Sequence, residues 1–226
     1  MKLIFFWLLD LLFPPKCALC GRLLQRQETD FCEKCRRTTP EFPALPRKEH
    51  PNRKTKLQFL DSFTAVWYYN RNVRSAVLNL KFHGRRDLAA PLGRKLAMKL
   101  MLEQPDAFDL VTWAPVSGIR KFRRGFDQSQ LLAQTVSREL GIPALGLLKK
   151  RRNNRPQSTL TADDRRKNVQ GIYHYAGDVP LTGERILLID DVFTTGSTAE
   201  ECAKVLLAAG AGSVCCGAIA AAEHAG

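Results

Sequence analysis

The alternation of apolar and polar positions predicts strands and helices in turn over the last three quarters of the chain. Two runs, 63–69 (FTAVWYY) and 108–115 (FDLVTWAP), are short and rich in β-branched and aromatic residues, as strands are. Two others, 186–189 (ILLI) and 213–220 (SVCCGAIA), are continuously apolar, which is typical of parallel strands covered on both faces. Strands separated by helical segments predict an α/β fold with a parallel sheet flanked by helices.

Helices are predicted between these strands by apolar residues at helical spacing. Four helices are expected. The first has an apolar face of Val73, Val77 and Leu80, and the second covers about 88–102. The third has an apolar face of Leu132, Val136 and Leu140, and the fourth one of Cys202, Val205, Leu206 and Ala209. Asp127 is placed to cap the third helix, and Gly141 to end it. Ser197 and Glu200 fit a capping box at the start of the fourth. A basic loop is expected at 117–126, and a long loop or extended hairpin at 149–176.

The first residues, MKLIFFWLLDLLFPPKC, form an apolar run from 3 to 13. Asp10 interrupts the run, no small-residue cleavage site follows, and Pro14 and Pro15 end it, so a signal peptide is disfavoured. The run is also shorter than the roughly 20 residues that a membrane-spanning helix needs. We interpret it as a short helix that docks on the rest of the protein, and we expect no stable membrane insertion.

Four cysteines form two CxxC pairs separated by eleven residues, at Cys17, Cys20, Cys32 and Cys35. Two such pairs can place four thiolates around a tetrahedral Zn²⁺, which predicts a closed structural zinc site. The alternatives are a redox pair or plain buried thiols. The other three cysteines fall on predicted core positions, and the absence of a credible secretion signal favours a reducing, cytoplasmic location.

The chain of 226 residues is long enough for one full domain and a small appendage. Composition divides it into three parts. Residues 1–45 hold the apolar helix and the four-cysteine zinc unit, 46–61 are rich in proline and charge and form a linker, and 62–226 form the α/β domain.

The formal net charge is +13, with 35 Lys and Arg residues against 22 Asp and Glu residues. Such a surface favours anionic partners, namely nucleic acid, phosphorylated metabolites or an acidic membrane surface. A solvated basic surface without a partner is the alternative.

Against this charge, the run RILLIDDVFTTGST at 185–198 places Asp190 and Asp191 at the end of a buried strand. Ligands of open α/β sheets bind at the carboxyl ends of the strands. The following loop leads into a helix N-terminus, whose free N–H groups and dipole favour phosphate. The sequence is neither a Walker A loop nor a GxGxxG motif. Carboxylates for hydroxyl groups beside a cradle for phosphate together predict a sugar phosphate as ligand.

The stretch LLIDDVFTTGST closely resembles the phosphoribosyl-pyrophosphate (PRPP) signature of type I phosphoribosyltransferases. The resemblance implies that Asp190 and Asp191 are the catalytic pair and hold the ribose hydroxyls, that the loop wraps the 5′-phosphate, and that Mg²⁺ accompanies the pyrophosphate. The implied PRPP-binding residues are Asp190, Asp191, Thr194, Thr195, Gly196, Ser197 and Thr198, the pyrophosphate loop Pro115, Val116 and Ser117, and the basic residues Arg124 and Arg155. Purine-type members often have an acid at the position of Thr194, so this chain has no obvious general base.

The whole arrangement resembles the ComF family, through the double CxxC, the KF-x-GR stretch (81–85), the RGF-x-Q stretch (124–128) and DDV-x-TTG-x-T (190–198). The resemblance implies a bacterial cytoplasmic protein of natural competence with PRPP as its ligand, without implying a reaction. One hypothesis is an enzyme that transfers the phosphoribosyl group of PRPP, with Mg²⁺, to an unknown acceptor. The alternative is a non-catalytic accessory protein that senses PRPP or a nucleotide and binds single-stranded DNA, with a partner such as a DNA helicase. Phe82, Phe122 and Phe126 lie near basic residues and could stack on bases. A plain zinc-ribbon DNA-binding protein would leave the α/β part unexplained.

Overall fold

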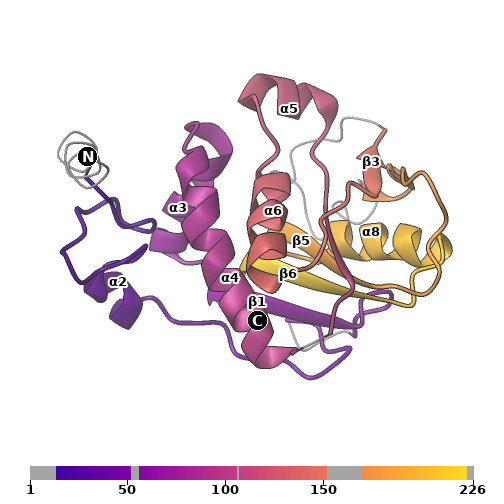
Figure 1. Ribbon diagram of the computed structural model, residues 1–226, viewed down its shortest axis with the longest axis horizontal. Coiled ribbons are helices and arrows are strands. Elements are labelled where there is room, and N and C mark those ends of the chain that lie inside the picture. The colour runs from indigo at the N-terminus through magenta and orange to yellow at the C-terminus, as the bar shows by residue number, and fades with distance from the viewer. Residues whose placement is uncertain (1–13, 52–55, 106, 152–168, 223–226) are drawn as a thin grey trace.

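The computed structural model describes residues 14–51, 56–105, 107–151 and 169–222 (Figure 1). Its centre is a four-stranded sheet in the order β1-β6-β5-β2, and each of the three pairings is parallel. The strands are β1 (Ser62–Tyr68), β2 (Leu110–Trp113), β5 (Arg185–Phe193) and β6 (Ser213–Ala221). The predicted parallel sheet is therefore confirmed, with every strand within a few residues of its expected position.

Helices cover both faces of this sheet (Figure 1). On one face lie α3 (Arg71–Phe82), α4 (Ala89–Glu103) and α6 (Gln128–Leu140), and on the other lies α8 (Ser197–Ala208). Away from the sheet are α2 (Glu33–Thr38), in the four-cysteine segment, and α5 (Gly118–Arg124), which buries none of its residues, and a short 3₁₀ turn forms at Arg86–Leu88. Alternation along β5 assigns the faces, because Leu187 and Ile189 pack in the same core layer as α3, α4 and α6, whereas Ile186 and Leu188 pack with α8.

Strand β2 is shorter than its neighbour β5, and this difference opens one edge of the sheet. The last pair of the β2–β5 ladder is Trp113 with Ile189. The Ala114 N–H still donates to the Ile189 carbonyl at 3.0 Å, but Pro115 has no N–H with which to continue. Strand β5 itself runs on along β6 to Phe193. Among the residues that the structure describes, the edge of β5 from Asp190 onward therefore has no strand partner on the β2 side.

A separate antiparallel hairpin joins β3 (Leu148–Lys150) to β4 (Tyr173–Tyr175). It stands where the sequence predicted a long loop or extended hairpin, and the segment 152–168 between its strands, with Arg155, lies outside the described residues. The basic segment expected to be a loop is instead helix α5, which Gly125 ends with a φ of 74°. None of the residues of α5 is buried, so its sequence has no apolar stripe from which a helix could be predicted.

The four-cysteine unit packs directly on the α/β part. The ring of Phe31 meets that of Trp67 in β1 edge-on at 5.4 Å, and Asp30 accepts hydrogen bonds from the Arg94 guanidinium in α4. Leu57 and Leu60 of the predicted linker are buried. The division of the chain into a zinc unit (1–45), a linker (46–61) and an α/β domain (62–226) stays a prediction. Within the described ranges, no helix has the length and apolar character to cross a membrane, and the run 3–13 lies outside those ranges.

Candidate PRPP cleft and four-cysteine centre

A cleft of about 1150 Å³ opens at the carboxyl ends of β2 and β5. It brings together most of the residues predicted to bind PRPP, namely Pro115, Val116, Arg124, Asp190, Asp191, Thr194, Thr195, Gly196, Ser197 and Thr198. Ser117 does not line it, because its side chain is buried at the N-cap of α5. Arg155 lies outside the described residues. Two parts of the chain that are far apart in sequence, 115–124 and 190–198, thus meet at one edge of the sheet.

Asp191 is the more tightly held of the two carboxylates. Its Oδ1 atom lies 2.8 Å from Nζ of Lys81 at the end of α3, and its Oδ2 atom accepts a hydrogen bond of 2.9 Å from Nε2 of Gln128 at the start of α6. Sequence reasoning did not predict these partners. The signal was present, since Lys81 opens the KF-x-GR stretch and Gln128 closes the RGF-x-Q stretch. The two motifs and the DDV motif therefore converge on one carboxylate.

Asp190 lies on the opposite face of β5 from Asp191, because successive residues of a strand alternate, and among the described residues it has no charged partner as close as Lys81 is to Asp191. Its Oδ1 atom accepts from the Asp191 N–H at 2.8 Å and from the Ser129 hydroxyl at 3.4 Å. Burial, and next the neighbouring charge of Asp191, raises the pKa of Asp190 to about 7, although Lys81 acts in the opposite direction. Near neutral pH the pair therefore carries less than two full negative charges.

The loop after β5 is shaped by Gly196, which caps α8 with a φ of 72°. A Cβ atom there would lie 2.5 Å from the Phe193 ring, so both backbone and space require glycine. The hydroxyls of Thr195 and Ser197 hydrogen-bond to each other at 2.8 Å. The predicted capping box is wrong, because Glu200 turns away from Ser197 and its carboxylate accepts from two N–H groups of another segment, those of Gln58 and Phe59. The N-cap residue of α8 is Gly196, which has no side chain with which to cap the first N–H groups.

Asp127 ties the predicted pyrophosphate loop to α6. Its Oδ1 atom accepts from the N–H groups of Ser129 and Gln130 at 3.0 and 3.2 Å, which confirms the predicted N-cap. Its Oδ2 atom accepts from the Val116 N–H at 3.0 Å. One buried carboxylate therefore fixes both the start of the helix and the loop at the floor of the cleft.

The four predicted zinc ligands lie together, with all four sulfur atoms within 4.8 Å of one another. In a tetrahedral site with Zn–S bonds of about 2.3 Å, sulfur atoms stand roughly 3.8 Å apart, and Cys20 and Cys32 are separated by 3.7 Å. The N–H groups of Cys32 and Cys35 donate to the sulfurs of Cys17 and Cys32, respectively. The donor set fits Zn²⁺ and leaves no coordination position for a substrate.

Comparison with known proteins agrees with this arrangement. A family model described as a double zinc ribbon domain matches residues 8–47. The DNA utilization protein YhgH of Salmonella typhimurium is 30% identical over 203 residues, which cover 88% of this chain and 86% of that protein. Competence protein F of Haemophilus influenzae is 29% identical, over 85% of this chain and 78% of that protein. The chain belongs to the ComF family. Competence protein ComFC of Bacillus subtilis is a further relative, 25% identical over 86% of this chain and 72% of its own length.

Solved phosphoribosyltransferases match this ComF family member over part of its length. Glutamine PRPP amidotransferase from B. subtilis, complexed with ADP and GMP, is 22% identical over 62% of this chain with a TM-score of 0.40, and the match spans 30% of that enzyme. A purine phosphoribosyltransferase from Pyrococcus horikoshii is 20% identical over 56% of this chain and 71% of its own, with a TM-score of 0.35. The fold assignment rests on the strand pairings of the chain itself.

Cationic and aromatic side chains gather at the mouth of the cleft in this ComF family member. The Arg124 guanidinium lies 4.7 Å from the centre of the Phe82 ring and donates to Gln128 at 2.8 Å, and burial lowers its pKa. Phe82 and Phe122 are exposed, whereas Phe126 is buried with the Arg86 guanidinium over its ring. Two of the three predicted stacking rings are therefore accessible.

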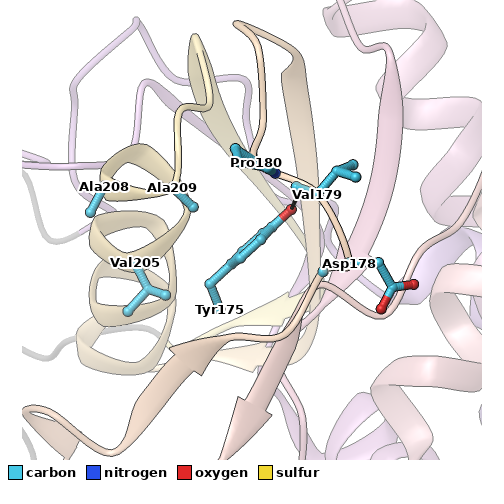
Figure 2. Close-up of a pocket in the computed structure, with 8 residues that line it drawn as sticks. Tyr175, Asp178, Val179, Pro180, Val205, Ala208 and Ala209 are labelled. Carbon is cyan, nitrogen blue, oxygen red and sulfur yellow. Dashed lines mark hydrogen bonds between the residues drawn. The ribbon is translucent and has the colours of Figure 1, made fainter.

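A second pocket, of about 590 Å³, lies between α8 and the loop after β4 (Figure 2). Tyr175 crosses it and donates a hydrogen bond of 2.6 Å to the Val179 carbonyl. The residues that line it include no lysine or arginine, and Asp178 is the one charged side chain among them. This lining does not suit a phosphate.

Proposed function

We propose that the protein binds PRPP, with Mg²⁺, in the cleft at the ends of β2 and β5, and that it acts in the cytoplasm in the handling of DNA. The observation that carries the proposal is the meeting of three parts in one cleft: the Asp190–Asp191 pair, the loop 194–198 at the N-terminus of α8, and residues 114–116, which Asp127 holds through the Val116 N–H. Carboxylates suit ribose hydroxyls, and the helix terminus suits the 5′-phosphate. The names of the relatives, competence protein F and DNA utilization protein, support the process.

The chemistry we propose for this site is phosphoribosyl transfer to an acceptor that is not identified. The bond between the anomeric carbon and the pyrophosphate oxygen breaks, pyrophosphate leaves with the electron pair, and a lone pair of the acceptor forms the new bond as its proton is lost. Positive charge grows on the sugar as the bond breaks, and the Asp190–Asp191 pair stabilises that charge. Mg²⁺ would be held through the pyrophosphate oxygens and would neutralise their charge.

Calorimetry of PRPP binding, with and without Mg²⁺, tests the proposal on the zinc-loaded protein. The test variant carries Asp190→Asn and Asp191→Asn. A matched control carries Glu139→Gln and Asp178→Asn, which remove two carboxylates from exposed positions away from the cleft. We expect Mg²⁺-dependent binding in the wild type and in the control, and its loss in the test variant. Absence of PRPP binding by the folded wild type would overturn the proposal.

A second candidate function is binding of single-stranded DNA, and the surface of α5 favours it. Phe122 is 89% exposed and Ile119 is 60% exposed, on a helix that also carries Arg120, Lys121 and Arg123. Single-strand binders combine cations that follow the backbone with aromatic rings that stack on bases. A competence protein such as a DNA helicase is then the expected partner.

Titration of a labelled oligonucleotide at several salt concentrations tests this candidate. Arg123→Gln should reduce the salt slope by about 0.7, the share of one phosphate contact on a single strand. Phe122→Ala should weaken binding about tenfold, within the range of one lost stacked base. Val179→Ala, at another exposed apolar residue, should leave binding unchanged. Equal binding by all variants would remove α5 from the DNA surface.

A further inference from the structure

The loop proposed to hold the 5′-phosphate has no cation of its own. Residues 194–198 are TTGST, so they offer hydroxyl and backbone N–H donors and the partial positive charge of the α8 N-terminus, about half an elementary charge. A phosphate monoester carries nearly two negative charges at neutral pH. Most of the charge on such a ligand must therefore be balanced by a side chain from another segment.

Lys150, the last residue of β3, is connected to this loop through the hairpin. It pairs with Tyr173 across the β3–β4 ladder, and its Nζ donates a hydrogen bond of 3.1 Å to the Tyr173 hydroxyl. Burial raises the pKa of Tyr173, and the side chain of Thr198 in the first turn of α8 acts in the opposite direction, which places Thr198 beside the same hydroxyl. Lys150, Tyr173 and Thr198 all line the PRPP cleft.

Lys150 is partly buried in the cleft. Among the described residues, no carboxylate lies within ion-pair distance of its Nζ atom, whereas Lys81 in the same cleft is paired with Asp191. Burial, together with the nearby charge of Arg120, lowers the pKa of Lys150 to about 8. A buried ammonium group is costly unless an anion accompanies it, so its place in the cleft indicates where an anion binds.

We propose that Lys150 is the cation that pairs with the 5′-phosphate of the ligand, and that Tyr173 positions it toward the loop 194–198. The assignment rests on the proposed function and adds a residue that is in neither the DDV motif nor the set of residues predicted to bind PRPP. It also gives the β3–β4 hairpin a role, because the hairpin places the positive charge of Lys150 beside the loop 194–198, which has no cation of its own.

The test compares Lys150→Met with Lys149→Met by calorimetry. Both variants lose one positive charge, but Lys149 is exposed and faces away, since adjacent residues of a strand point to opposite sides. The probes are ribose 5-phosphate, PRPP with Mg²⁺, and pyrophosphate with Mg²⁺. A charge-assisted hydrogen bond predicts about 10- to 100-fold weaker binding of the two 5′-phosphate probes by Lys150→Met. Lys149→Met should bind every probe as the wild type does, and Lys150→Met should keep its affinity for pyrophosphate.

Two further readouts separate a charge role from a structural one. Lys150→Arg, which keeps the charge, should retain more affinity for ribose 5-phosphate than Lys150→Met. At pH 8.5 the wild type should take up a proton when ribose 5-phosphate binds, because the dianion raises the pKa of Lys150, and Lys150→Met should not. Equal affinities of wild type and folded Lys150→Met for PRPP would overturn the assignment and leave the proposed function standing. Absence of all binding by the wild type would overturn both.

Discussion

Lys81, in the last turn of α3, holds Asp191 of β5 through a 2.8 Å contact between its Nζ atom and Oδ1. The carboxylate is 6% exposed and the lysine side chain 22%, so water screens the pair only weakly. The pair joins the helix before the cleft to the strand that ends in it. The charge of Asp191 is thereby compensated before any ligand arrives.

Removing Lys81 should therefore destabilise the protein. We expect Lys81→Met to lower the free energy of unfolding by roughly 2 kcal/mol, because Asp191 is left buried with only Gln128 as partner. Urea unfolding of the zinc-loaded protein measures this change. In an Asp191→Asn background the same substitution should cost much less. Equal costs in the two backgrounds would show that the pair does not couple.

Asp190 should make stability depend on pH. Its pKa is about 7 in the folded protein against 3.8 as the ordinary value, so between pH 4 and pH 7 the folded state holds a proton that the unfolded chain releases. Stability from this group is therefore greatest at low pH and falls as the pH rises toward 7. Asp190→Asn cannot ionise, so its melting temperature relative to wild type should be higher at pH 8 than at pH 5. The exposed Asp178→Asn should show no such change, and a pH-independent difference for Asp190→Asn would refute the prediction.

Substitutions at Asp127 can distinguish its contact with the Val116 N–H from its role as the N-cap of α6. Asp127→Asn keeps an oxygen that can accept from Ser129 and Gln130, but its NH₂ group cannot accept from the Val116 N–H. We expect nearly normal stability and weaker binding of PRPP with Mg²⁺ for this variant. Asp127→Ala should lose the cap as well, at about 1 kcal/mol in unfolding free energy. Thermal melts and calorimetry on the two variants check both statements, and unchanged PRPP affinity in Asp127→Asn would rule out a role for the Val116 contact.

The strands, the long helices and the acidic loop could be predicted because each has a local signal. The continuous apolar run before Asp190 and the cap at Asp127 need no knowledge of the rest of the chain. The partners of these groups could not be derived from local patterns. Gln128 and Asp191 are 63 residues apart, and Glu200 reaches a backbone N–H 142 residues away. Tertiary contacts decided those cases, and for Glu200 they overrode a capping motif that looked complete.

Zinc should stabilise the α/β part as well as the cysteine unit, because the two share one core. Phe31 precedes the ligand Cys32 and packs edge-on against Trp67 of β1, and Cys17, Cys32 and Cys35 are buried in the same apolar cluster. Without the metal, four thiols lose the restraint that holds Phe31 in place.

We therefore expect a chelator, or Cys32→Ser, to lower the melting temperature of the whole protein by about 5–10 °C. In a protein of this size, each 1 kcal/mol lost from the free energy of unfolding lowers the melting temperature by about 2–4 °C. Circular dichroism follows the α/β part, and Trp67 emission should move to longer wavelength as its environment opens. Phe31→Ala with zinc bound should reproduce a share of both effects, because it removes the contact and keeps the metal. Two separate transitions, with the second at the temperature of the zinc-loaded protein, would mean that the unit and the sheet unfold independently.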